Sequence, residues 1–339
     1  MKLLITGGAG FIGVRLAQAL LQQGQLAGRR IERIVLADQA AAPATLLDDA
    51  RVEGRVAPLL STCETLRDED FDGVFHLASA VSGECEADFD LGMRSNLDST
   101  RALLDALRHR QLQGGPATRL VFSSSVAVFG PDPALPWTGR VADDTLPTPQ
   151  TSYGMQKLVC EQLIADYTRK GFIDGRAARL MTVTVRPGRP NGAASSFFSG
   201  IIREPLAGQP GVLPVGRDVS HPVSSPTRTV QGLIAVFEAG RDDGAGGLRG
   251  RTAMNLPALN VTVQQMLDAL EAVAGPRVRA LVHEQRDERI AGIVANWPTG
   301  ATAARAAALG LMPEESFEDI IRQYIADNAA NPAALAGLN

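Results

Sequence analysis

Short apolar runs alternate with longer amphipathic stretches over the first half of the chain. The apolar runs predict buried strands at 2–6, 31–38, 73–79, 119–125 and 181–187, with one more near 54–58. Apolar residues at three- and four-residue spacing predict helices at 11–24, 95–110 and 152–170. Strands that are apolar throughout and alternate with helices indicate an α/β protein, whose parallel sheet is covered by helices on both faces.

The pattern loosens after about Arg186. Segments rich in Gly, Pro and Ser separate predicted helices at 227–239, 262–274 and 317–328. We therefore predict a doubly wound domain over 1–186 and a smaller C-terminal lobe over 187–339. The lobe is expected mostly to bind the substrate, and a return of the chain to the first domain is left open. The Ala-rich end of the chain is expected to fray.

Bulk composition narrows the choice of partners. The 339 residues are 45% hydrophobic and 21% charged, with a formal net charge of −4, which gives no electrostatic argument for nucleic acid or an anionic membrane. Glycines interrupt the apolar start of the chain, so we expect neither a signal peptide nor a transmembrane span. Cys63, Cys85 and Cys160 are odd in number and far apart, which favours reduced thiols and a cytoplasmic location.

The spacing of possible metal ligands does not predict a metal site. The four histidines are as scattered as the cysteines. Acidic residues between 84 and 90 better fit the exposed start of a helix, whose dipole favours negative charge. His76 lies on an apolar strand, where a hydrogen-bonded buried histidine is more common than a catalytic one.

A glycine-rich loop follows the first predicted strand. In "TGGAGFIG" (6–13), Gly7, Gly10 and Gly13 precede a helix, and Phe11 and Ile12 belong to its first turn. Glycine lets the backbone come close to a pyrophosphate, and free N–H groups at a helix N-terminus bind anions. The loop therefore predicts a dinucleotide site, with tight strand–helix packing as the alternative.

An acidic residue ends the next predicted strand. A carboxylate at Asp38 can accept hydrogen bonds from the adenosine ribose hydroxyls and would repel a 2′-phosphate. The residues after it offer no cation for such a phosphate. This pattern predicts NAD as the cofactor, and the alternative is an aspartate that caps a turn.

A serine, a tyrosine and a lysine form the candidate catalytic set. Ser125 ends a predicted strand, and Tyr153 and Lys157 are four residues apart on one face of a predicted helix. A free tyrosine titrates near pH ~10, and lowering that value by about three units takes roughly 4 kcal/mol. A neighbouring lysine ammonium group and a positively charged nicotinamide ring can supply this energy in a dry site. Tyr153 is thus predicted to act as the base.

These motifs together resemble a known family. "TGGAGFIG", "HLAS", "SNLDST", "VFSSSVAVFG", "YGMQK" and "VRPGRPNG" occur in the order seen in extended short-chain dehydrogenases/reductases, in the epimerase and dehydratase branch. The resemblance covers essentially the whole chain and implies a Rossmann-type sheet. It also implies that Ser125 polarises the substrate, that Tyr153 is the catalytic acid/base, and that Lys157 both tunes Tyr153 and binds the nicotinamide ribose.

The resemblance implies further contacts. The backbone at Leu77 and Ala78 is expected to run past the cofactor, and Asn96 is expected to support the site from the next helix. Pro187 and Gly188 are expected to border the nicotinamide. A homodimer built from helices 95–110 and 152–170 of each subunit is also implied.

The substrate is predicted to be a small polyhydroxylated acid. No acid pair follows Ser125, which disfavours dehydration. A nucleotide sugar generally needs a wide pocket lined by basic and aromatic groups, whereas the chain is only 5% aromatic and its stretch 191–215 is rich in small and hydroxylated residues. The stretches at 76–108 and 182–215 resemble dehydrogenases that oxidise the C2 hydroxyl of a four-carbon sugar acid such as D-erythronate with NAD. Alternatives are a nucleotide-sugar 4-epimerase, a uronate dehydrogenase, or a non-catalytic NAD-binding sensor.

A carboxylate substrate needs charge-assisted donors. Arg189 and Asn191 follow the last predicted strand at the edge where ligands of open α/β sheets bind. Ser82 and Gly83 lie in a loop after "HLAS" and can add a hydroxyl and a backbone N–H. We predict that these four residues and Ser125 contact the substrate, and a solvated Arg189 is the alternative.

Overall fold

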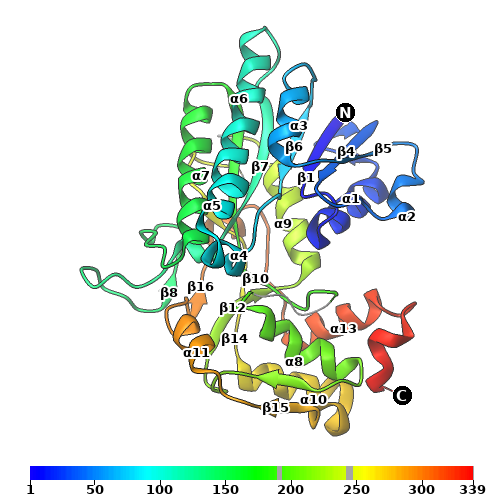
Figure 1. Ribbon diagram of the computed structural model, residues 1–339, viewed down its shortest axis with the longest axis vertical. Coiled ribbons are helices and arrows are strands. Elements are labelled where there is room, and N and C mark those ends of the chain that lie inside the picture. The colour runs from blue at the N-terminus through cyan, green and yellow to red at the C-terminus, as the bar shows by residue number, and fades with distance from the viewer. Residues whose placement is uncertain (189–192, 242–246, 339) are drawn as a thin grey trace.

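The computed structural model describes residues 1–188, 193–241 and 247–338. Its centre is a seven-stranded sheet with the order β13-β9-β7-β6-β1-β4-β5, in which every neighbouring pair is parallel (Figure 1). The predicted doubly wound α/β fold is confirmed. The strands of this sheet are β1 (Lys2–Thr6), β4 (Arg33–Asp38), β5 (Val52–Val56), β6 (Gly73–His76), β7 (Thr118–Ser125), β9 (Ile173–Leu180) and β13 (Met254–Asn255).

Helices cover both faces of this sheet. On one face, α1 (Phe11–Gln23) packs against α9 (Pro226–Glu238). The other face is covered by α3 (Leu59–Leu66), α6 (Ser99–Leu112) and α7 (Ser152–Arg169), as Figure 1 shows. Successive residues of β1 enter opposite cores, with Leu3 on the α1 side and Leu4 on the α6 side. This double burial explains why the strand is apolar throughout.

Short elements complete the connections of this domain. They are β2 (Gln25–Leu26), β3 (Arg29–Arg30), α2 (Ala44–Leu47), α4 (Ser82–Ala87), α5 (Phe89–Gly92), the π-helical segment η1 (Met93–Asp98), the 3-10 turn η2 (Val126–Val128) and β8 (Arg140–Val141). The helix predicted at 95–110 therefore begins within η1 and continues as α6. None of the helices in the described ranges is long and apolar enough to cross a membrane.

One strand lies elsewhere than its sequence pattern predicts. The strand expected at 181–187 is present only as the two-residue β10 (Thr182–Val183), outside the central sheet, because the sheet strand β9 ends at Leu180. Two arginines hide β9 in the sequence, although both are buried in the structure. Arg176 pairs with Asp174, and Arg179 pairs with Glu161 of α7. Because each buried cation has a carboxylate partner, a polar-looking segment can occupy the interior of the sheet.

The C-terminal half builds a lobe below the sheet in Figure 1. Its core includes Phe198 and Ile201 of α8, Leu267 of α10 and Ile321 of α13. The sequence patterns do not predict α8. The elements of this half are β10 (Thr182–Val183), α8 (Ser196–Leu206), β11 (Gly211–Leu213), β12 (Ser220–Ser224), β14 (Leu259–Thr262), α10 (Val263–Arg279), β15 (Val282–Glu284), α11 (Glu288–Val294), β16 (Gly300–Ala301), α12 (Ala304–Ala307), α13 (Phe317–Asp327) and the 3-10 segment η4 (Pro332–Leu338).

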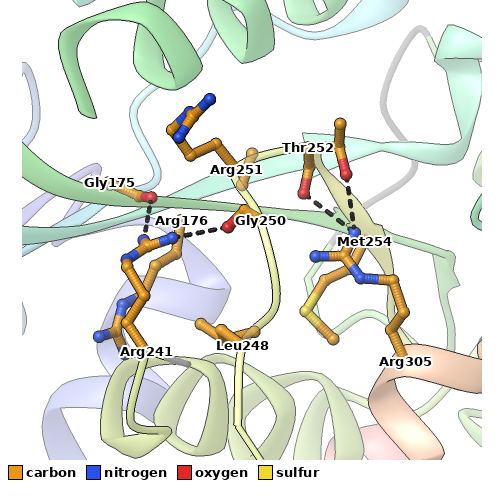
Figure 2. A pocket seen from close by; sticks show the side chains of 10 residues that line it. Gly175, Arg176, Arg241, Leu248, Gly250, Arg251, Thr252, Met254 and Arg305 are labelled. Atoms are coloured by element: carbon orange, nitrogen blue, oxygen red, sulfur yellow. Dashed lines mark hydrogen bonds between the residues drawn. The ribbon is translucent and has the colours of Figure 1, made fainter. Parts of the chain in front are cut away.

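The chain returns from this half to the sheet. β13 pairs with β9 at the sheet edge, and α9 packs on β7 and β9. Arginines fasten the returning segment, as Figure 2 shows. Arg241 donates to the carbonyl oxygens of Gly175 (2.9 Å) and Gly250 (2.7 Å), and Arg305 donates to the carbonyl oxygen of Thr252 (3.0 Å). Residues far along the chain thus complete the first sheet.

The last described segment, residues 332–338, is packed against α8, which corrects the expectation that it frays. η4 lies against α8, and the guanidinium of Arg277 donates to the Gly337 carbonyl oxygen at 3.1 Å. A Cβ atom on Gly337 would come within 2.2 Å of the Pro205 carbonyl oxygen. A small residue therefore allows this close contact between the last segment and α8.

Candidate active site

A cleft of about 1550 Å³ opens at the carboxyl ends of the central strands, between the sheet and the lobe. Ligands of doubly wound sheets bind at this edge, where the strand order reverses between β1 and β6. Eleven of the residues predicted to bind cofactor or substrate lie on its walls. They are Gly7, Gly10, Phe11, Ile12, Gly13, Leu77, Ser82, Gly83, Ser125, Tyr153 and Lys157.

The glycine loop forms a tight turn at the start of α1. Gly7 has a φ of +70°, and a Cβ atom there would come within 2.7 Å of the Ala78 backbone nitrogen. A Cβ atom on Gly13 would lie 2.2 Å from the Gly7 carbonyl oxygen. No side chain caps the N-terminus of α1 at Gly10 in the described structure. This bare helix terminus at the cleft wall fits the pyrophosphate of a dinucleotide.

Asp38 is tied to the glycine loop. Its carboxylate accepts hydrogen bonds from the backbone N–H of Ala9 at 3.0 Å and of Ala40 at 3.2 Å. The turn-capping role left open by the sequence is therefore present. A carboxylate has about four lone-pair sites, so these two bonds leave capacity for ribose hydroxyls.

Asn96 acts on the loop after β6. The side chain is buried in η1, and its carbonyl oxygen accepts from the Ser79 hydroxyl at 3.0 Å and from the Ala80 N–H at 2.7 Å. Its amide donates to the Gln156 side chain of α7 at 2.8 Å. Asn96 therefore joins α7 to the loop that begins at Leu77, and it is not among the described residues that line the cleft.

A close contact brings Tyr153 to the end of β7. Thr151 caps α7 by accepting from the Gly154 N–H at 3.0 Å. A Cβ atom on Gly154 would come within 2.1 Å of the Ala127 carbonyl oxygen, in the turn after Ser125. Only glycine allows the first turn of α7 to lie this near the serine turn. Ser125 and Tyr153 consequently line the same cleft.

Lys157 is a buried cation beneath Tyr153. Its Nζ donates to the Ser123 carbonyl oxygen at 2.8 Å, and it lies 5.5 Å from the centre of the Tyr153 ring and 4.7 Å from that of Phe122. The side chain is 3% exposed. An ammonium group has three donors, and Ser123 is its one acceptor among the residues that the structure describes. The remaining donors fit the ribose hydroxyls of a bound nicotinamide nucleotide.

A buried ion pair between α7 and β9 lies next to this cluster. Glu161, one helical turn after Lys157, accepts from Arg179 at 2.9 and 2.8 Å and from the Ser124 hydroxyl at 2.5 Å. The guanidinium of Arg179 also lies 4.8 Å from the centre of the Phe129 ring. The sequence reasoning missed this pair, although the four-residue step from Lys157 to Glu161 is the signal that could have revealed it.

His76 is neutral and fully buried. Its Nδ1 lies 2.7 Å from the Thr6 hydroxyl and its Nε2 lies 2.9 Å from the Thr100 hydroxyl. The Thr100 hydroxyl donates to the backbone carbonyl oxygen of Asn96. The Nε2–H of His76 must therefore donate to Thr100, and its Nδ1 must accept from Thr6. Burial, together with the charge of Lys157, lowers the pKa of His76 to about 3.

Another wall of the cleft is formed by the end of β9 and the residues that follow it. Leu180, Met181, Thr182 and Val183 line the cleft where the sequence placed Pro187 and Gly188, because β9 ends earlier than predicted. Pro187 and Gly188 do not appear among the described lining residues. Arg189 and Asn191 lie outside the described residues, so their predicted contacts with substrate stay predictions.

Arg186 is a cleft cation that the sequence reasoning missed. Its guanidinium donates from Nε to the Val183 carbonyl oxygen at 2.9 Å and from Nη2 to the Ser195 hydroxyl at 3.0 Å. Burial lowers the pKa of Arg186, and the tyrosinate form of Tyr153 opposes this shift. Both side chains line the same cleft.

Comparisons with known proteins identify the family. The chain matches the NAD dependent epimerase/dehydratase family over residues 3–222. D-erythronate dehydrogenases from Cupriavidus necator and Haemophilus influenzae are 47% and 41% identical to it, covering 96% of this chain and 98% and 99% of theirs. A solved nucleoside-diphosphate-sugar epimerase from Agrobacterium tumefaciens is 42% identical, with a TM-score of 0.89 over 98% of this chain and 96% of its own. Proteins named UDP-glucose 4-epimerase are more distant, at 24–32% identity.

The protein therefore belongs to the NAD dependent epimerase/dehydratase family. The relatives from Cupriavidus necator and Haemophilus influenzae, which match nearly the whole chain, are dehydrogenases. The family membership and the NAD dependence predicted from the sequence motifs are confirmed.

The buried histidines predict how stability depends on pH. Burial lowers the pKa of His76 to about 3 and that of His221 to about 4, whereas an unfolded histidine titrates near ~6.5. Between these values the unfolded chain binds protons that the folded chain does not. Stability is therefore retained above about pH 6.5 and falls with decreasing pH, by about 1.4 kcal/mol per pH unit for each histidine.

Denaturant unfolding between about pH 6.5 and pH 4.5 tests this expectation. His76→Gln should reduce the slope of the unfolding free energy against pH by about 1.4 kcal/mol per pH unit, which is the contribution of one histidine. His109→Gln is the matched control, because His109 is exposed on α6 and should leave the slope unchanged. An unaltered slope in His76→Gln would contradict the assignment.

Proposed function

We propose that this enzyme oxidises the C2 hydroxyl of a short sugar acid with NAD, and that D-erythronate is converted to 2-dehydro-D-erythronate. The observation that carries the proposal is that Ser125 and Tyr153 line one cleft, with the buried ammonium of Lys157 lying 5.5 Å from the centre of the Tyr153 ring. The high identity to D-erythronate dehydrogenases over nearly the whole chain supports the choice of substrate.

In this proposal the sheet edge holds NAD, which supplies the hydride acceptor. The bare N-terminus of α1 binds the pyrophosphate, and Asp38 accepts from the adenosine ribose. Leu77 and Ala78 pass along the cofactor, and the free donors of Lys157 bind the nicotinamide ribose. Residues 1–186 would supply most of these contacts, and the lobe would enclose the substrate.

Tyr153 would take the proton. Oxidation breaks the C2–H bond, whose electron pair leaves as hydride, and the O–H bond, whose proton passes to the phenolate oxygen of Tyr153 as the carbonyl forms. Lys157 favours the phenolate, because a cation near the ring stabilises the negative form. Ser125 ends β7 and would donate to the substrate oxygen. Asn96 would keep the neighbouring loop in place without touching the substrate.

Arg186 would bind the substrate carboxylate. Arg186 is a cation on the wall of the cleft that Tyr153 also lines, and two of its five N–H donors are used among the described residues. A C1 carboxylate must lie within a bond or two of the reacting C2. Ser82 and Gly83 at the start of α4 would add further hydrogen-bond donors. Arg189 and Asn191 would also bind the acid, as the sequence predicts.

The other functions have less support. The identity to UDP-glucose 4-epimerases is lower than that to the dehydrogenases, and no Asp-Glu pair follows Ser125 for dehydration. A cofactor sensor needs no base, whereas Tyr153 and Lys157 are held in contact. A homodimer through α6 and α7 also belongs to the proposal, as does a cytoplasmic location, which the free cysteines Cys63, Cys85 and Cys160 support.

The tyrosine prediction tests the chemistry. Tyr153→Phe removes the proton acceptor and keeps the ring, so turnover with D-erythronate should fall at least about 100-fold while NAD still binds. NADH formation and NAD titration measure the two quantities. Tyr167→Phe on the same helix is the control, because its hydroxyl bonds Asp105 away from the cleft and its loss should leave turnover intact. Normal turnover in Tyr153→Phe would exclude this mechanism.

The cofactor prediction tests Asp38. Asp38→Asn keeps the shape of the side chain and removes its charge, so the preference of kcat/KM for NAD over NADP should shrink by about tenfold or more. Asp70→Asn, on an exposed side chain, is the control. Equal use of both cofactors by the unaltered enzyme would show that Asp38 does not face the ribose.

The substrate prediction combines a panel with one variant. Among aldonic acids, four-carbon acids such as D-erythronate should reduce NAD, and UDP-glucose should not bind in calorimetry. Arg186→Gln should raise KM for the acid by roughly 10- to 100-fold and leave KM for NAD unchanged, because charge-assisted hydrogen bonds are lost. The KM for the acid in Arg186→Lys should lie between that of the unaltered enzyme and that of Arg186→Gln. Tight UDP-glucose binding without oxidation of any aldonate would favour the epimerase instead.

A further inference from the structure

A second polar pair lies on the lobe side of the cleft. The hydroxyl of Thr182 and the Nε2 of His221 are 2.7 Å apart, and the Nδ1 of His221 lies 3.0 Å from the Pro298 carbonyl oxygen. Both side chains are buried, at 8% and 2% exposure, and both line the cleft. The mechanism proposed above does not use either of them.

The histidine ring is held in a fixed orientation. It stacks on Phe198 with ring centres 4.9 Å apart and planes at 9°, and Trp297 packs against it with ring centres 5.3 Å apart. β12 carries His221, and its pairing with β10 sets Thr182 opposite Val223. Aromatic packing and strand pairing therefore prevent the ring from turning away from Thr182.

The hydrogen-bond partners determine where the protons lie. A carbonyl oxygen can only accept, so the Nδ1 of His221 must carry the proton that Pro298 receives. A neutral imidazole has one N–H, so Nε2 is an acceptor and the Thr182 hydroxyl must donate to it. Because the Thr182 hydroxyl donates its only proton to His221, its oxygen can only accept a hydrogen bond from a group in the cleft.

This acceptor lies close to the reacting groups. Leu180 pairs with Ser125 in the sheet register, and Thr182 follows two residues later on the same cleft wall. A substrate whose C2 hydroxyl faces Ser125 and Tyr153 can extend its next carbon along this wall toward Thr182. A hydroxyl there would meet an acceptor with fixed polarity.

We propose that Thr182 is a specificity-determining residue that accepts a hydrogen bond from the C3 hydroxyl of the acid, and that His221 is the positioning residue that keeps Thr182 an acceptor. The proposal rests on the proposed oxidation of a short sugar acid. It adds a selection for a hydroxyl next to the reacting carbon. An acid with a methylene at C3 leaves a buried acceptor without a partner, which sites built for a hydroxyl reject strongly.

A pair of substrates tests this selection. D-erythronate and the 3-deoxy acid of matching C2 configuration, 2,4-dihydroxybutanoate, differ only in the C3 hydroxyl. The unaltered enzyme should prefer D-erythronate in kcat/KM by about tenfold or more. Thr182→Val, which has the same shape without the hydroxyl, should reduce this ratio to near one. Thr182→Ser should keep most of it.

The positioning role has its own variant. His221→Phe keeps a ring between Phe198 and Trp297 and removes the Nε2 acceptor, so the Thr182 hydroxyl is free to donate. The ratio between the two acids should fall in this variant, while KM for NAD stays unchanged. A merely structural role would instead lower kcat/KM for both acids by the same factor and leave the ratio intact.

The outcomes separate the two proposals. If the unaltered enzyme oxidises D-erythronate and Thr182→Val keeps the full preference, the role of Thr182 is wrong and the proposed function stands. If the unaltered enzyme oxidises neither acid, the proposed function is wrong and the role of Thr182 falls with it. A preference that collapses in Thr182→Val and survives in Thr182→Ser supports the inference.

Discussion

Burial of the Lys157 ammonium group is the constraint around which the cleft is organised. A cation that loses its water is stable only where polar or aromatic groups replace it. The Ser123 carbonyl oxygen and the rings of Phe122 and Tyr153 do so here, and they come from β7 and α7. The charge therefore holds the helix against the strand. Burial keeps His76 neutral, and the charge of Lys157 adds to this effect because it disfavours a second cation nearby.

The parts of the site that sequence could predict are those with a local pattern. Gly7, Gly10 and Gly13 share one turn, and Tyr153 and Lys157 share one helical face, so spacing alone identifies them. The parts that sequence missed depend on contacts between distant segments. The ion pair of Glu161 with Arg179 joins α7 to β9, and the pair of Thr182 with His221 joins β10 to β12. The step from Lys157 to Glu161 places Glu161 on the face of Lys157, but nothing in the spacing of α7 or of β10 identifies the distant partner.

The misplaced strand has the same origin. "MTVTVRP" is rich in β-branched residues, which favour strands, whereas "IDGRAARL" contains two arginines. In the fold, the arginines are neutralised by carboxylates, one of which lies on another element. The apolar segment after β9 instead lines the cleft and starts the lobe. A hydrophobic pattern records burial of apolar side chains, so it cannot register a strand whose burial depends on paired charges.

The late return of the chain to the sheet has a consequence for how the protein is made. Six strands of the central sheet are complete by Leu180, but β13 is not synthesised until residues 254–255, about 70 residues later. At ordinary rates of translation this interval lasts roughly 4 to 14 seconds. During that time the outer edge of β9 has no strand partner, and open sheet edges are sites of aggregation. The N-terminal domain of a nascent chain therefore waits for its own C-terminal half, and its folding is completed late in synthesis.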